Sequence, residues 1–161
     1  AGVPRPRLLV VDAAGANALS VGRDARRAAV VATTGLLDQL SRIELEGVLA
    51  HELCHLRSGD VVPATVASAA VQATWPGRLL AGFLVGRAVD ARRELAADVG
   101  AARLTRYPPG LAAGLERLAE VGTAVPAAPA SAAHLWFAAP GPGDDGLHRG
   151  LEERVEALRE L

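Results

Sequence analysis

An α+β fold, mainly helical with a small and mostly antiparallel three-stranded sheet near the N-terminus, is predicted by the order of apolar segments. Residues 7–11, 17–21 and 29–32 are short and rich in valine or leucine, as strands are, and glycines punctuate the chain between them. Strands so close in sequence are joined most simply by short turns, which connect antiparallel neighbours. From residue 34 onward, the apolar residues recur mainly at helical spacing.

The helices are expected at residues 34–40, 42–59, 61–75, 78–105, 111–120 and 151–161. Thr34 is the expected cap of the first helix. The second is marked most clearly, because Ser41 and Glu44 have the spacing of a capping box and Gly59 is a typical stop. Proline, glycine and serine in residues 123–131 and 140–146 indicate flexible connections.

The composition indicates one domain that covers residues 1–161. Half of the residues are hydrophobic, and the formal net charge of −1 argues against a strongly basic nucleic-acid binder. A single cysteine, Cys54, excludes an internal disulfide. No uniformly apolar stretch reaches the ~20 residues of a membrane helix, so we expect a soluble domain. The chain lacks an initial methionine, which suggests a piece excised from a longer, membrane-anchored parent.

The most informative segment is His51-Glu52-Leu53-Cys54-His55, within the second expected helix. Residues four apart lie one turn apart on the same helix face, so the imidazoles of His51 and His55 converge. Two neutral imidazoles can fill two corners of a tetrahedral zinc site, with Glu52 directed at a water on the metal. The alternative is a surface helix that carries two histidines by chance.

A zinc site needs a third protein ligand, and acidic residues follow the motif. Glu94 and Asp98 lie four apart on an expected helix. Glu94 would complete a His-His-Glu site, and Asp98, one turn on, would accept the free ring N–H of a ligating histidine. The alternative is a solvated acidic face that pairs with Arg92 and Arg93.

Several segments in a fixed order resemble the HtpX and CAAX prenyl protease family of zinc metallopeptidases. They are residues 16–22 (Ala-Asn-Ala-Leu-Ser-Val-Gly), residues 31–37 (Val-Ala-Thr-Thr-Gly-Leu-Leu), residues 44–52 with the start of the metal motif, Asp60, the group Arg93, Glu94 and Asp98, and His148 with Arg154 near the end. The resemblance covers nearly the whole chain.

This resemblance implies a zincin-like metalloprotease domain that binds one Zn²⁺ ion through His51, His55 and Glu94. Glu52 would be the general base of peptide-bond hydrolysis. The implied substrates are proteins or peptides, among them membrane or misfolded proteins. The parent chain would associate with a membrane and hold this domain on the cytoplasmic face.

Three further residues are candidates for contact with the substrate. His148 would be a second catalytic residue that donates to the oxyanion, although Arg149 stands where the family has proline. It could instead bind zinc in a resting state, or be an exposed histidine at a helix N-terminus. Asn17 and Ala18 would lie at a sheet edge to which a peptide adds as a strand. The alternative is that Asn17 satisfies its own backbone.

Two functions of other classes compete with an active protease. One is a metal-binding sensor or regulatory module of the antirepressor-peptidase type, which shares the metal helix and a similar spacing to an Arg-Glu-x-x-x-Asp helix. The other is a catalytically silent scaffold that binds membrane partners through residues 61–89. The elements around Asn17 and His148 argue against the sensor.

Overall fold

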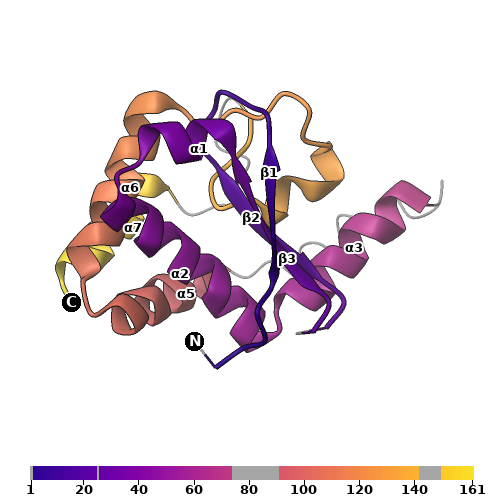
Figure 1. Ribbon diagram of the computed structural model, residues 1–161, viewed down its shortest axis with the longest axis horizontal. Helices are drawn as coiled ribbons and strands as arrows, with labels where there is room; N and C mark the ends of the chain where they lie inside the picture. Colours follow the sequence, from indigo (N-terminus) through magenta and orange to yellow (C-terminus); the bar gives the residue numbers. More distant parts are fainter. Residues whose placement is uncertain (1, 25, 74–90, 142–149) are drawn as a thin grey trace.

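The computed structural model describes residues 2–24, 26–73, 91–141 and 150–161, which form a helical body beside a three-stranded sheet (Figure 1). The predicted α+β class is confirmed. The strands are β1 (Arg7–Val11), β2 (Ala18–Gly22) and β3 (Ala28–Thr33). The helical elements are α1 (Thr34–Gln39), α2 (Arg42–Ser58), α3 (Val61–Ala73), α5 (Ala91–Thr105), α6 (Pro108–Val121), the 3₁₀ helix η1 (Ala130–Leu135) and α7 (Leu151–Arg159).

The sheet is mixed, which differs from the mostly antiparallel sheet that we expected. Its strand order is β1-β3-β2, in which β3 pairs in parallel with β1 and antiparallel with β2. β2 and β3 form a hairpin, and the connection from β1 to β2 crosses the sheet so that β1 lies on the far side of β3 from β2. Apolar content does not reveal which strand is central, and the strand order therefore could not be predicted.

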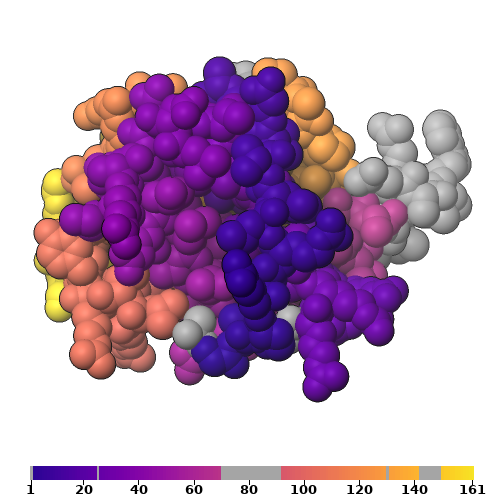
Figure 2. All heavy atoms as spheres, in the orientation of Figure 1, coloured from indigo at the N-terminus to yellow at the C-terminus, as the bar shows by residue number. Residues whose placement is uncertain are grey.

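Strand β1 is exposed along its whole length, whereas its sequence predicts a buried strand. It lies at the edge of the sheet, and α2 packs against β2 and β3. Leu8 is 66% exposed and Val10 is 59% exposed. In Figure 2 the indigo side chains of this N-terminal part lie at the surface that faces the viewer. The apolar residues therefore predicted the strand correctly, but the prediction that it is buried is wrong.

Helix α2, which carries the metal motif, has the predicted ends. The Ser41 side chain accepts the backbone N–H of Glu44, and the Glu44 carboxylate accepts the backbone N–H of Ser41 at 2.6 Å. Gly59 ends the helix with a φ of +78°, a left-handed conformation that glycine adopts without strain. Helix α1 is capped by Thr33, one residue before the expected Thr34, because the Thr33 hydroxyl accepts the Leu36 N–H.

The core holds α2 against α5 and α6. Gly47 allows α6 to approach closely, since a Cβ there would lie 2.8 Å from the Cα of Leu111. Around this contact the main cluster buries Val48, Leu115, Leu118 and Phe137. Burial of these side chains fixes α2 in place, so its histidines project from a rigid support.

The remaining predictions are met in part. Helix α6 begins earlier than expected, at Pro108, and η1 forms at the end of the segment 123–131 that we expected to be flexible. Of the helix expected at 78–105, the structure shows α5 from Ala91 onward. Residues 74–90 lie outside the described residues. In the part of the chain that the structure describes, no helix is long and apolar enough to span a bilayer.

Removal of the α2 cap tests this account of the helix. Ser41→Ala is expected to lower the free energy of unfolding by about 1 kcal/mol, because the backbone N–H of Glu44 loses its side-chain acceptor. Denaturant unfolding measures the change. Ser41→Asn keeps a capping side chain and should retain most of the stability; an equal loss in both variants would contradict the role of the cap.

Candidate metal centre

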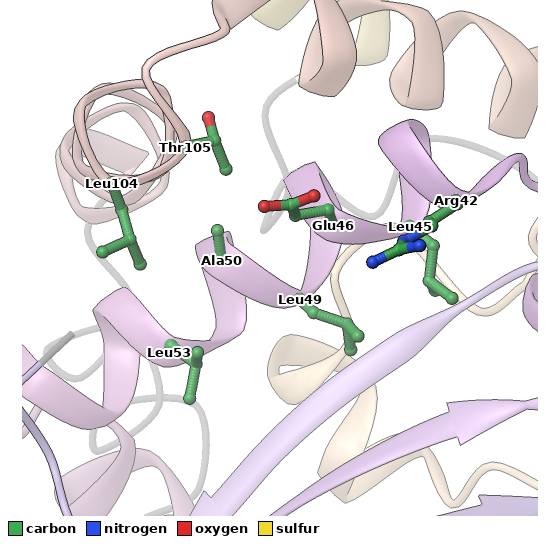
Figure 3. A pocket seen from close by; sticks show the side chains of 8 residues that line it. All are labelled: Arg42, Leu45, Glu46, Leu49, Ala50, Leu53, Leu104 and Thr105. Carbon is green, nitrogen blue, oxygen red and sulfur yellow. The ribbon is translucent and has the colours of Figure 1, made fainter.

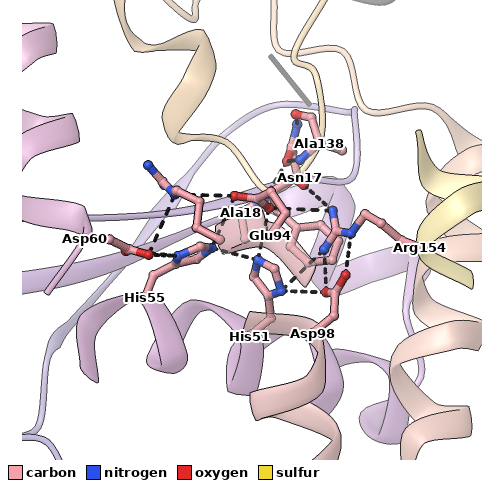
Figure 4. Close-up of polar contacts among 11 residues, drawn as sticks. Asn17, Ala18, His51, His55, Asp60, Glu94, Asp98, Ala138 and Arg154 are labelled. Carbon is pink, nitrogen blue, oxygen red and sulfur yellow. Dashed lines mark hydrogen bonds and ion pairs between the residues drawn. The ribbon is translucent and has the colours of Figure 1, made fainter. Parts of the chain in front are cut away.

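Two imidazole nitrogens meet on one face of α2. The Nε2 atoms of His51 and His55 lie 3.0 Å apart, and both side chains are buried (Figure 4). The one-turn spacing along the helix produces this convergence, as the sequence predicts. Neighbouring elements then determine what the two nitrogens face.

Helix α5 supplies the third member of the group. The Glu94 carboxylate places one oxygen 3.4 Å from His51 Nε2 and the other 3.5 Å from His55 Nε2. One ligand atom from each of the three residues lies within 4.8 Å of the others, and all three residues are buried. The structure therefore brings together the three metal ligands that the sequence predicts.

A second carboxylate stands behind each imidazole. Asp98 Oδ1 lies 2.7 Å from His51 Nδ1, and the oxygens of Asp60 lie 3.0 and 3.1 Å from His55 Nδ1. Because an ionised carboxylate only accepts hydrogen bonds, these contacts favour the proton on Nδ1 in each ring. Asp98 was predicted for this place. Asp60, five residues after His55, entered the sequence analysis only as part of the family resemblance.

These tautomers make the group suitable for a cation. With Nδ1 protonated, the lone pairs of both Nε2 atoms and the Glu94 carboxylate converge as three acceptors. Such acceptors repel one another in a buried place unless a proton or a metal ion lies between them. In a tetrahedral zinc site two ligand nitrogens lie about 3.3 Å apart. The 3.0 Å observed here is close to that spacing, so the residues fit zinc.

The protonation of the group agrees with this interpretation. Burial alone would lower the pKa of His51, but the charge of Asp98 and the hydrogen bonds to Asp98 and Glu94 raise it to about 9, against the opposing charge of Arg154. Burial would raise the pKa of Glu94, but the hydrogen bond to His51 and the charges of His51, His55 and Arg154 hold that pKa below its usual range. Together the two shifts keep the proton on His51 and leave Glu94 as a carboxylate.

Arg154 of α7 joins the site, although the sequence gave it only as the last residue of the resemblance. Its Nε and Nη2 atoms donate to the two oxygens of Asp98 at 2.8 Å each. Its Nη1 donates to the carbonyl of Phe137 at 2.8 Å. Burial would raise the pKa of Asp98, but the charges of Arg154 and His51 lower it to about 2. Asp98 is therefore held as a carboxylate.

Glu52 lies beside the histidines and is almost fully buried. Ser20 of β2 makes a hydrogen bond with its side chain, a contact that the sequence did not reveal. The other carboxylate oxygen, Oε2, has no hydrogen-bond partner among the described residues. Burial raises the pKa of Glu52 against the charges of His51 and His55. A carboxylate with an unfilled oxygen and a raised pKa can accept and return a proton.

The start of β2 is paired within the chain itself. The Asn17 side chain donates to the carbonyls of Thr123 and Ala138 at 3.0 and 2.9 Å, and it accepts the N–H groups of Ala18 and Ala138. The Ala18 carbonyl accepts the Phe137 N–H at 2.7 Å. Asn17 therefore holds the backbone of residues 18, 123 and 138 together at this edge.

The chain has two histidines besides His51 and His55. His148 lies outside the described residues. His134 is buried, and its Nε2 lies 3.1 Å from the carbonyl of Ala64 in α3.

A pocket of about 360 Å³ lies between α2 and the end of α5 (Figure 3). Its described lining includes Leu45, Leu49 and Leu53, which follow one another at intervals of one turn. Position 51 lies about 200° around a helix from position 49, so His51 projects from the opposite face. The candidate centre is therefore distinct from this apolar pocket.

Comparisons with known proteins agree with the geometry. The whole chain, residues 1–161, matches the model of peptidase family M48. Curated relatives named Protease HtpX homolog are 34% identical in Dictyoglomus thermophilum, over 99% of this chain and 64% of the relative, and 32% identical in Tropheryma whipplei strain Twist, over 99% and 68%. The chain thus spans about two thirds of the length of these relatives. No solved structure matches.

Proposed function

The chain belongs to peptidase family M48, and on that premise we propose that it is the catalytic domain of a zinc-dependent endopeptidase. The observation that carries the proposal is the convergence of His51, His55 and Glu94, three buried acceptors with a geometry that fits one Zn²⁺ ion. Family M48 supports a metallopeptidase. The proposed choice of zinc and of the reaction is supported by the chemistry of these residues.

In the proposed site the metal is bound by His51 and His55 from α2 and by Glu94 from α5. Asp98 and Asp60 hold the two imidazoles with Nε2 directed inward. When bound, zinc supplies Lewis-acid chemistry that makes water a nucleophile near neutral pH. The fold supplies a buried, preorganised set of ligands, which keeps the three side chains from rearranging.

Glu52 is the proposed general base. Its free oxygen accepts a proton from the attacking water, and the carboxylic acid then returns the proton to the leaving amine. Its raised pKa suits this exchange, because the group takes up a proton more readily than an exposed glutamate. Ser20 steadies the side chain through its hydrogen bond. Such a group contributes on the order of 10²–10⁴-fold to the rate.

Substrate is proposed to bind along the edge of β2 beyond Leu19, because residues 136 and 137 already pair with Leu19 and Ala18. The side chain of Asn17 is filled by backbone partners, so its proposed part is to hold the strand and the segment around Ala138 in place. Ala18 would contribute through its position in the strand. His148 is proposed, from the resemblance alone, as the donor to the oxyanion of the tetrahedral intermediate.

The proposed substrates are proteins or peptides, among them membrane or misfolded proteins. We place the domain on the cytoplasmic face of a membrane, with its parent chain associated with that membrane, because of the resemblance to HtpX. The antirepressor-type sensor and the silent scaffold are not favoured, since the whole chain matches a peptidase family and Glu52 is in place beside the ligands.

Removal of the general base tests the mechanism. Glu52→Gln is expected to reduce casein cleavage at least about 10²-fold, because the amide cannot accept the proton, while zinc content per chain stays unchanged. Glu46→Gln is the matched control, an exposed position on the same helix. Full activity of Glu52→Gln would contradict the mechanism, and a wild-type protein that binds zinc but cleaves no substrate would contradict the proposed function.

Zinc affinity should rise with pH. Below the raised pKa of His51, about 9, the metal-free imidazole is protonated, so zinc must displace that proton. Each proton released makes affinity rise about tenfold per pH unit, and we expect this rise between pH 6 and 8. Calorimetry at pH 7 in buffers of different ionisation enthalpy counts the protons. Release of no proton at pH 7 would contradict the expected charge state.

A further inference from the structure

Arg154 is the largest fully buried side chain among the described residues, and peptide-bond hydrolysis as proposed gives it no part. It is 1% exposed, and it lies on α7, far along the chain from the α2 and α5 residues that form the centre. A buried guanidinium is strongly unfavourable unless its donors are filled. The contacts that fill its donors therefore indicate the role of this side chain.

The guanidinium reaches His51 through two neighbours, Asp98 and Phe137, and two of its own nitrogens also approach the candidate ligands: Nη2 lies 3.3 Å from His51 Nδ1 and Nη1 lies 4.0 Å from a Glu94 oxygen. Through Nε and Nη2 it grips both oxygens of Asp98, and Asp98 Oδ1 in turn lies 2.7 Å from His51 Nδ1. Its carbon also lies 4.3 Å from the centre of the Phe137 ring. That ring meets the His51 ring edge to face, with centroids 4.7 Å apart and planes at 87°. Asp98 and Phe137, both neighbours of the imidazole, are thus in contact with the Arg154 side chain, and Figure 4 shows the Arg154–Asp98–His51 contacts.

We propose that Arg154 is a positioning residue of the metal centre, which fixes the tautomer and direction of His51 through Asp98 and so couples the docking of α7 to metal affinity. This inference rests on the proposed function. The two-pronged contact prevents the carboxylate from turning about its bond to the chain. Asp98 Oδ1 then stays on His51 Nδ1, and Nε2 keeps its lone pair toward the ligands.

His55 is also contacted by a carboxylate that pairs with an arginine, but these contacts are longer and more exposed than those behind His51. Behind His55, Asp60 is paired with Arg93, whose Nε lies 3.7 Å from Asp60 Oδ2 and 3.8 Å from a Glu94 oxygen. The Asp60 side chain is 24% exposed, so water competes for its oxygens. The carboxylate that bonds to His51 Nδ1 is therefore held more firmly than the one that bonds to His55 Nδ1. Loss of Arg154 should accordingly weaken metal binding more than loss of Arg93.

The test is the zinc dissociation constant, measured by competition with a chromophoric chelator. Arg154→Met, which removes charge and donors, is expected to weaken zinc binding 10–100-fold. Arg154→Lys keeps the charge without the fork and should recover part of the loss. Arg159→Met is the matched control on the same helix, because Arg159 is 66% exposed and pairs with Glu116 at the surface. It should bind zinc within twofold of wild type, and Arg93→Met should lose less than Arg154→Met.

A double-mutant cycle separates positioning from plain stabilisation. If Arg154 acts through Asp98, the Asp98→Asn/Arg154→Met protein should bind zinc as weakly as Asp98→Asn alone. The double variant also removes both buried charges, so it remains informative if Arg154→Met does not fold. In metal-free protein, at a pH above the His51 pKa of about 9 where the imidazole is neutral, a nitrogen spectrum of labelled histidine should show that Arg154→Lys retains the Nδ1-protonated form of His51 less completely than wild type.

The outcomes distinguish the two proposals. Wild-type protein without zinc affinity would overturn the proposed function and this inference with it. If the wild-type protein binds zinc and Arg154→Met binds it as tightly as Arg159→Met, the inference about Arg154 is wrong, whereas the proposed function stands. Additive losses in the cycle would overturn it as well, because they would mean that Arg154 and Asp98 act separately. A folded Arg154→Met with a lower melting temperature but unchanged zinc affinity would show a structural role only.

Discussion

The need to balance converging acceptors inside the protein governs this structure. His51, His55 and Glu94 direct lone pairs at one another in a buried place, and the carboxylates behind the rings add negative charge. Such a group is tolerable only with a cation or a proton at its centre. The raised pKa of His51 and the lowered pKa of Glu94 are two consequences of that one constraint.

The rest of the fold serves to keep this group together. A capped and tightly packed α2 fixes the histidines, and α5 lies against it with Glu94 and Asp98 on the side that faces them. The hairpin of β2 and β3 brings Ser20 to Glu52. Helix α7 closes the arrangement through Arg154. Segments from both ends of the chain therefore meet at one centre.

Sequence was informative wherever the contacts are local. One-turn spacing placed His51 with His55, and a second one-turn spacing placed Glu94 with Asp98. It could not find Ser20 or the grip of Arg154, because those contacts join residues far apart in sequence and no local pattern encodes them. The same limit explains β1: its leucines and valines indicate a strand, but its exposure depends on which elements cover it. Strand order in the mixed sheet is likewise a property of the assembled fold.

The most direct test of the central claim is the zinc X-ray absorption spectrum of the wild-type protein. This account predicts one zinc per chain with two imidazole nitrogens and carboxylate or water oxygens at about 2.0–2.2 Å. A sulfur neighbour at about 2.3 Å would instead mean that Cys54 binds the metal. That result, or a single imidazole in the spectrum, would contradict the convergence of His51, His55 and Glu94 on one ion.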